Sequence, residues 1–244
     1  MRIISLVPSL SEYLWALGLD EQVVGVTKFC VHPNHWWREK TRVGGTKQVN
    51  FDAIQQLQPT LIIANKEENT KEDIERLQQN YEVLLTDINS IDDAFRDLLR
   101  IGECVHKLEE TKELLQEIKN AFAATKNMGT GATFLYFIWQ DPHYVVGPNT
   151  YIHSLLSYFG LKNVCTIERY PELQEVLANT VEPNQYPDFI FLSSEPYPFK
   201  KEHVTAFQQR FPQSKVLLID GEMCSWYGSR MLAVPRYLKQ KFLE

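Results

Sequence analysis

The two halves of the sequence repeat one order of predicted elements, and this repeat limits the fold more than any other feature. In each half a short apolar strand leads into a capped helix that ends at a glycine, and a later strand begins at a proline and is followed by polar residues. These elements are residues 3–7, 9–18 and 59–64 in the first half, and 134–139, 151–160 and 187–192 in the second. Alternating strands and helices predict parallel βαβ units, with ligand crevices at the carboxyl ends of the strands. A chance similarity between two α/β halves is the alternative.

Short polar motifs predict where the helices begin. Ser9-Leu10-Ser11-Glu12 fits a capping box with Ser9 as the N-cap, and Gly18 suits the C′ position that ends this helix. Asn50 or Asp52 is expected to cap a helix at residues 51–57, and Gly147-Pro148-Asn149-Thr150 to cap the helix at 151–159. Further strands are expected at residues 23–27 and 81–87, with a polar-faced helix at 71–80 between them.

The segment from residue 91 to about 127 has no proline and one glycine, Gly102, at which it can divide into two helices. Its apolar residues recur at helical spacing, with one interruption at Thr111: Leu98, Ile101, Val105, Leu108, Leu114, Leu115, Ile118 and Phe122. Residues 103–125 alone would make a helix of roughly 35 Å, which is long enough to tie two bodies together. We therefore predict an N-terminal α/β lobe at residues 1–100, a connecting helix at 101–126 and a C-terminal α/β lobe at 127–244, with a ligand cleft between Rossmann-like lobes that have parallel-sheet cores.

Composition and motifs exclude several classes of protein. The 244 residues carry a net charge of −6 without a basic block, so nucleic acid is not expected as a partner. No apolar run is long enough to insert into a membrane, and the opening residues are too short a run for a signal peptide. The four cysteines lie far apart, which favours isolated thiols. Because no phosphate loop, nucleophile elbow or dinucleotide fingerprint is found, we predict that the protein is not an enzyme.

The ordered motifs resemble one known family. They are Arg2-Ile3-Ile4-Ser5-Leu6-Val7-Pro8-Ser9-Leu10-Ser11-Glu12, Val43-Gly44-Gly45-Thr46, Pro59-Thr60-Leu61-Ile62-Ile63-Ala64, Val146-Gly147-Pro148-Asn149-Thr150-Tyr151-Ile152 and Pro187-Asp188-Phe189-Ile190. In this order and spacing they resemble the helical-backbone (class III) substrate-binding proteins of ABC importers. The resemblance is to the vitamin B12 and iron-siderophore receptor group, and most of all to its cobalamin-binding branch.

The resemblance implies two α/β lobes joined by one long rigid helix, with limited closure when ligand enters the cleft. The implied ligand is a corrinoid or an iron-siderophore or haem-type metal chelate, and no cofactor of the protein's own is implied. The implied partner is an ABC permease and ATPase complex, with the binding protein acting as a monomer in the periplasm or on the cell surface. Exported members of the family carry a leader before the first strand, whereas this chain begins at that strand. The alternative hypothesis is a cytoplasmic metal- or cofactor-binding protein that reuses the fold without a permease.

Residues that match ligand contacts of the cobalamin-binding branch are expected to line the cleft. Tyr144 and Tyr170 match its aromatic positions, His32 falls where the branch has a tyrosine, and Glu222 falls near an acidic contact. Asn65 stands where the branch has a tryptophan, which is a departure from the cobalamin pattern. Loops expected near the same cleft add four aromatic residues: Trp139, Tyr197, Trp226 and Tyr227. For each aromatic residue, packing or ordinary surface exposure is the alternative.

Three further sets of residues have two interpretations each. Arg230 suits recognition of a carboxylate or phosphate, or else a salt bridge to a neighbouring acid. Glu72 in the first lobe and Glu172 or Glu175 in the second match acids that dock to the permease, with Glu67, Glu68 and Glu195 as competing candidates and a solvated helix face as the alternative. Cys30, His32 and His35 have side chains that bind zinc or copper, but Pro33 interrupts them, so cleft lining or packing is the preferred interpretation.

Overall fold

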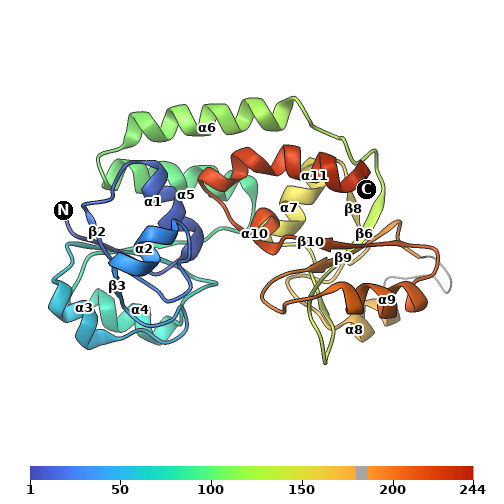
Figure 1. The fold of residues 1–244 in the computed structure, drawn as a ribbon, viewed down its shortest axis with the longest axis horizontal. Helices are drawn as coiled ribbons and strands as arrows, with labels where there is room; N and C mark the ends of the chain where they lie inside the picture. The colour runs from blue at the N-terminus through green and yellow to red at the C-terminus, as the bar shows by residue number, and fades with distance from the viewer. Residues whose placement is uncertain (180–185, 244) are drawn as a thin grey trace. The chain divides into compact units, whose positions relative to one another are not determined.

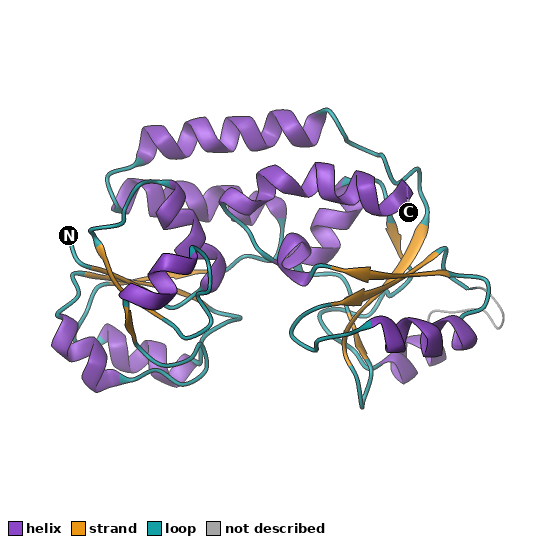
Figure 2. Cartoon of the chain, viewed as in Figure 1, coloured by secondary structure: helices purple, strands orange, loops and turns teal. Residues whose placement is uncertain are grey.

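The structure is a computed structural model that describes residues 1–179 and 186–243, and its chain divides into two compact units. Unit 1 contains Met1–Ile88, Asp92–Glu117 and Tyr227–Arg230. Unit 2 contains Asn89–Ile91, Ile118–Trp226 and Met231–Glu244. Each unit has its own β-sheet with helices packed on it (Figures 1 and 2).

The sheet of unit 1 has five strands, all paired in parallel. In spatial order they are β3 (Thr41–Arg42), β2 (Val23–Val26), β1 (Ile3–Ser5), β4 (Leu61–Asn65) and β5 (Val83–Thr86). The order reverses between β1 and β4, which makes the edge beyond their carboxyl ends the expected place for a ligand.

The helices of unit 1 are α1 (Pro8–Ala16), α2 (Asn34–Glu39), α3 (Phe51–Leu57), α4 (Lys71–Gln78), nearly all of α5 (Ile91–Cys104) and the first part of α6 (Leu108–Ala123). Within the unit, α3 and α4 cover one face of the sheet and α1 and α5 the other (Figure 1). The core beneath α3 and α4 is formed by buried aliphatic residues of the strands and of these two helices, among them Ile4, Ile62, Ile54 and Leu77. Both faces are thus covered, as parallel sheets require.

The sheet of unit 2 is mixed. Its path is β10 (Lys215–Ile219), β9 (Phe189–Ser193), β6 (Thr133–Trp139) and β7 (Tyr144–Val145), and β8 (Lys162–Asn163) also pairs with β6. β7 runs antiparallel to β6, whereas the other pairs are parallel. The predicted parallel core is present, and β7 is an additional strand at its edge. It is antiparallel because four residues between Trp139 and Tyr144 are too few for a crossover and permit only a hairpin.

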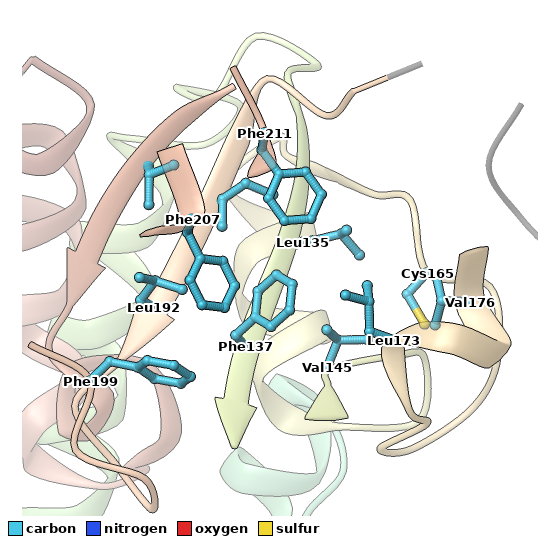
Figure 3. Close-up of a cluster of buried hydrophobic side chains, with 12 residues drawn as sticks. Leu135, Phe137, Val145, Cys165, Leu173, Val176, Leu192, Phe199, Phe207 and Phe211 are labelled. Atoms are coloured by element: carbon cyan, nitrogen blue, oxygen red, sulfur yellow. The ribbon is translucent and has the colours of Figure 1, made fainter. Parts of the chain in front are cut away.

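The helices of unit 2 are α7 (Tyr151–Tyr158), α8 (Leu173–Asn179), α9 (Lys201–Arg210), α10 (Gly221–Ser225) and α11 (Val234–Leu243), and a 3₁₀ turn, η1 (Ser229–Ala233), begins in unit 1. Figure 3 shows the core between the sheet and helices α8 and α9. Phe207 of α9 meets Phe137 of β6 with ring centroids 4.8 Å apart at 79°. This edge-to-face geometry is favourable for aromatic pairs.

The predicted α/β class with two sheet cores is confirmed, and so are two of the predicted helix caps. The Asn50 side chain accepts from the amide of Ala53, and the Thr150 hydroxyl accepts from the amide of His153. The predicted Ser9 cap is wrong. The N-cap lies two residues earlier, at Val7, which makes no side-chain bond, and helix α1 begins at Pro8. Proline fits the first helical position because its φ is preset and no amide hydrogen is lost there.

Two helices, α5 and α6, occupy the predicted connecting segment, and they divide just beyond Gly102. Gly102 is required there because a Cβ atom would lie 2.2 Å from the Thr111 hydroxyl oxygen. That hydroxyl lies 2.7 Å from the hydroxyl of Tyr13, which also donates to the Leu98 carbonyl. A buried hydrogen bond therefore explains why a polar residue, Thr111, interrupts the apolar positions.

The boundary between the two units falls within α6, after Glu117. The predicted domain limits at residues 100 and 126 stay predictions.

Candidate ligand-binding edges of the two sheets

Parallel pairing places the carboxyl ends of several strands along one edge in each unit. We call these the unit 1 edge, beyond β1, β2, β4 and β5, and the unit 2 edge, beyond β6, β9 and β10. The loops at such edges are where α/β proteins bind ligands. Of the predicted ligand residues in unit 1, His32 lies in the loop after β2 and Asn65 ends β4. In unit 2, Trp139 ends β6, and Tyr197 and Glu222 follow β9 and β10.

The loop after β2 carries exposed apolar side chains at the unit 1 edge. Phe29 is 50% exposed and Val31 40% exposed, and His32 beside them is half-buried. The loop is fixed by the Lys28 amide, which donates to the Gly44 carbonyl at 2.8 Å. Sequence reasoning missed Phe29 and Val31, although two large apolar residues directly after a buried strand are a signal for a surface of this kind.

Asn65, at the end of β4, holds its own loop together. It is 2% exposed, and its side-chain nitrogen, Nδ2, donates to the Thr86 hydroxyl at 3.0 Å. Its side-chain oxygen accepts from the amides of Glu67 and Glu68 at 2.8 and 3.2 Å. These bonds use both ends of the carboxamide within unit 1, so they do not support the predicted contact with a ligand.

The cysteine of the alternative metal set, Cys30, is buried. The Cys30 sulfur lies 3.0 Å from the Ser11 hydroxyl and 3.1 Å from that of Thr27, and burial raises the pKa of its thiol. His35 lies on exposed helix α2, where its ring nitrogen is 3.1 Å from the Asp20 carboxylate. Among the described residues, no three His, Cys, Asp or Glu side chains form a group that could hold a metal ion.

Aromatic side chains gather at the unit 2 edge. Trp139 ends β6, is 41% exposed and pairs in register with Tyr144 of β7. Its ring lies edge-on to Tyr197, which follows β9, with centroids 5.8 Å apart. Three of the predicted ligand residues are therefore brought together by strand pairing and ring contact, although Tyr197 lies 58 positions from Trp139 in the sequence.

Tyr144 and Tyr170 lie on neighbouring segments of unit 2. Backbone bonds join these segments, from the Val145 amide to the Pro171 carbonyl at 3.1 Å and from the Gly147 amide to the Arg169 carbonyl at 2.8 Å. The Arg169 guanidinium lies over the Tyr170 ring, 5.5 Å from its centroid. Both tyrosines are partly exposed.

A pocket of about 540 Å³ lies at the same edge and contains three carboxylates, those of Glu195, Asp220 and Glu222. Glu195 accepts from the Ser225 hydroxyl at 2.7 Å and from the Trp226 indole at 3.1 Å. Burial raises the pKa of Glu195, and the charges of Glu222 and Asp220 act in the same direction, against the two hydrogen bonds. Trp226 is only 7% exposed, so this predicted ligand residue is mostly packed and bonded within unit 2.

Arg230 forms a two-pronged ion pair with Glu12. Its Nε is 2.8 Å from Glu12 Oε2 and its Nη2 is 2.9 Å from Oε1, with the two side chains 11% and 18% exposed. Of the two interpretations that the sequence left open, the structure shows the salt bridge. The pair holds the short segment Tyr227–Arg230 within unit 1, where Tyr227 is 7% exposed.

The predicted docking acids differ in exposure. Glu72 and Glu175 are exposed in the first turns of α4 and α8, where a carboxylate also suits the helix dipole. Glu172 is half-buried, pairs with Tyr144 through a backbone bridge and lies 3.4 Å from the Tyr144 hydroxyl. The competing candidates Glu67, Glu68 and Glu195 are each partly buried.

Sequence relatives include a cobalamin-binding protein of Halobacterium salinarum, which is 26% identical over an alignment of 195 residues that covers 75% of this chain and 52% of the relative. A vitamin B12-binding protein of Pectobacterium carotovorum is 22% identical over 95% of this chain and 84% of its own. The chain spans about half the length of the first relatives it matches. Within the described residues, helices long and apolar enough to cross a membrane were not found.

Solved structures share the fold over nearly the whole chain. A periplasmic haem-binding protein of Vibrio cholerae superposes with a TM-score of 0.81 at 18% identity, covering 100% of this chain and 99% of that one. A periplasmic vitamin B12-binding protein of the same organism gives 0.73 at 20% identity, covering 100% and 98%. At these identities the superpositions show the fold alone. A family model described as periplasmic binding protein matches residues 3–214, and the chain therefore belongs to the periplasmic binding protein family.

Proposed function

We propose that this protein is the solute-binding component of an ABC importer and captures a corrinoid or a haem- or siderophore-type metal chelate. The observation that carries the proposal is a set of apolar and aromatic side chains at the strand ends of each unit: the exposed Phe29 and Val31 in unit 1, and the exposed Trp139 with the partly exposed Tyr144 and Tyr197 in unit 2. Such surfaces suit a large, flat, amphipathic ligand. No bond is made or broken in this function.

Burial of apolar surface would supply most of the affinity. Each Å² removed from water contributes about 25 cal/mol, less the cost of association. Polar groups at the strand ends, such as His32 and the carboxylates of the acidic pocket, would then orient the ligand. The names of relatives support both ligand classes, since some are cobalamin-binding and some haem-binding proteins.

A ligand titration tests the proposal directly. The purified protein is titrated with cobalamin, cobinamide, haem and ferric siderophores, with quenching of tryptophan fluorescence as the signal and calorimetry as the control for light absorption by the ligand. Saturable binding at micromolar affinity or tighter is expected for one class. Absence of binding to every compound would contradict the proposal.

Replacing Tyr144 and Tyr170 together by alanine is expected to weaken binding about tenfold or more, or ~1.4 kcal/mol, because two accessible rings are lost from one face of the ligand. The dissociation constant of the ligand found in the titration is the measurement. Unchanged affinity in a folded double variant would remove the unit 2 edge from the site.

Two tryptophans of nearly equal exposure provide a matched control for this assignment. Trp139 is 41% exposed at the unit 2 edge, whereas Trp15 is 43% exposed in the last turn of α1, which runs back from the unit 1 edge. Trp139→Ala is expected to weaken ligand binding and Trp15→Ala to leave it unchanged. Equal losses in both variants would indicate a general effect on folding.

We also propose that Glu72 and Glu175 dock the protein to its permease, outside the cytoplasmic membrane and as a monomer. Replacing either exposed carboxylate by alanine is expected to leave ligand affinity unchanged and to reduce the stimulation of transporter ATPase activity, because a charged contact to the permease is lost. Glu109→Ala is the control, since this side chain is 77% exposed on α6. Full stimulation by the Glu72→Ala and Glu175→Ala variants would exclude these residues as the docking acids.

A further inference from the structure

The two oxygens of the Glu195 carboxylate have different environments. Oε1 accepts both described side-chain hydrogen bonds, from Ser225 and Trp226. Oε2 accepts no hydrogen bond from the described residues. A fully buried oxygen without a partner would be a buried unsatisfied atom, and Oε2 is not one of these. Oε2 is therefore in contact with solvent, on a residue that lines the acidic pocket of about 540 Å³.

The Glu195 side chain is held in place by close packing. A Cβ atom on Gly221 would lie 2.3 Å from Glu195 Cγ, so the glutamate side chain lies directly over this glycine. The Gly221 amide donates to the Ser194 hydroxyl at 2.9 Å, which fixes the start of α10 against the end of β9. Because the side chain is confined in this way, a change in its protonation changes its hydrogen bonds to Ser225 and Trp226 without moving it away from them.

Several titratable groups face Glu195 or share its pocket. They are Asp220, Glu222 and Cys224 at α10, Tyr136 of β6, and Tyr237 and Lys241 of α11. Burial is the largest influence on Glu195 and raises its pKa, and the charges of Glu222 and Asp220 raise it further. Glu195 therefore changes its charge at a higher pH than an exposed glutamate does.

We propose that Glu195 is a protonation-dependent contact and positioning residue of the unit 2 edge. Oε1 holds Ser225 and Trp226 in both protonation states, whereas Oε2 accepts a hydrogen bond from the bound molecule when ionised and donates one when protonated. The molecule favoured by the ionised form is one that offers N–H or O–H groups, such as the side-chain amides of a corrinoid. The carboxylate of Glu195 and those of its two neighbours, Asp220 and Glu222, disfavour ligand carboxylates at this point. The contact to ligand rests on the proposed function, but the positioning of Trp226 does not.

The pH dependence of stability follows from the raised pKa. Folding favours the protonated form of Glu195, because its pKa is raised in the folded protein. The stability that the protonated side chain contributes is therefore fully present below pH 4.5, the ordinary pKa of a glutamate, and is lost as the pH rises through the raised pKa of Glu195. Glu195→Gln keeps an oxygen that accepts from Ser225 and Trp226 but carries no charge. This variant is expected to have a higher Tm than the wild type near neutral pH, and the difference is expected to vanish at about pH 4.

The ligand-free test uses the indole N–H resonance of Trp226 in the full ¹⁵N-labelled chain, assigned by its loss in Trp226→Phe. The resonance is expected to shift with pH at a midpoint above 4.5, because the indole donates directly to Glu195. The shift should disappear in Glu195→Gln. It should remain in Glu222→Gln with a lower midpoint, since one repelling charge is removed. An identical pH shift in wild type and Glu195→Gln would overturn the proposal, as would a wild-type resonance that does not titrate.

The ligand test measures the dissociation constant of cobinamide, which carries several amide groups, across the same pH range. Affinity for the wild type is expected to fall about threefold to tenfold as the pH drops through the Trp226 midpoint, since a charged acceptor is replaced by a neutral group. Affinity for Glu195→Gln is expected to be independent of pH. Equal pH dependence in the two proteins would overturn the contact to ligand. Failure of cobinamide to bind at all would count against the proposed function for corrinoids, and the Trp226 resonance would still decide the role of Glu195.

Discussion

Replacing Gly147 by alanine is expected to lower the free energy of unfolding by about 3 kcal/mol, because the added methyl group has no space. Its Cβ would lie 1.8 Å from the backbone carbonyl oxygen of Ile167. The segment must then move away, which strains the bond from the Gly147 amide to Arg169 and the neighbouring bond from Val145 to Pro171. Thermal unfolding should show a decrease in Tm of about 6–12 °C for a chain of this size.

Gly45 provides the control for this substitution. A Cβ there would lie 3.3 Å from side-chain atoms of Lys28 and Phe29, which can move without breaking backbone bonds. Gly45→Ala is therefore expected to cost less than about 1 kcal/mol. Because Gly147 also fixes the segments that carry Tyr144 and Tyr170, Gly147→Ala should weaken ligand binding as well. A Tm for Gly147→Ala equal to that of Gly45→Ala would show that the two segments are not tightly packed.

Replacing Arg230 by alanine is expected to cost about 2–3 kcal/mol of unfolding free energy, because it leaves the mostly buried carboxylate of Glu12 without its partner. The two charges are joined by two bonds of 2.8 and 2.9 Å. The same substitution frees the segment that packs on α1 through Gly228, whose φ of +105° and close approach to Tyr13 both require glycine. Denaturant unfolding of Arg230→Ala, Glu12→Ala and the double variant measures the coupling.

An exposed pair on α4 gives the comparison. Lys71 and Glu75 are 3.6 Å apart with side chains 82% and 60% exposed, and Glu75→Ala is expected to change stability by less than about 0.5 kcal/mol. The losses from Arg230→Ala and Glu12→Ala should not add in the double variant, since each removes the same interaction. Additive losses would show that the ion pair contributes little and that each residue acts through other contacts.

Much of the local structure could be predicted because it depends on neighbours in the sequence. The caps at Asn50 and Thr150 need only a side chain that reaches an amide three positions later, and the glycines that end helices need only their own φ. The Ser9 cap was wrong for the same local reason. Pro8 competes for the start of the helix, and the capping-box pattern does not weigh one signal against the other.

The candidate site was predicted in part. The strand ends followed from the alternation of strands and helices, which also pointed to Trp139 and Tyr197, whereas Tyr144 was expected from the family resemblance; the three residues lie together at one edge. Asn65 and Trp226 were expected to face a ligand, but their polar atoms are bonded inside their own units, which depends on partners 21 and 31 residues away. Phe29 and Val31 were missed although two large apolar residues soon after a buried strand are a signal for such a surface, and only their degree of exposure depends on the folded loop.

The sequence by itself determined the α/β class, the two sheet cores and the order of the elements, because apolar periodicity, prolines, glycines and capping residues act over a few positions. Only the tertiary structure decided what the polar and charged residues do. Arg230 pairs with Glu12 across 218 positions, and Thr111 bonds to Tyr13 across 98. A guanidinium or a hydroxyl can bond to any acceptor that the fold brings within about 3 Å, so its role is set by packing and not by its neighbours in the chain.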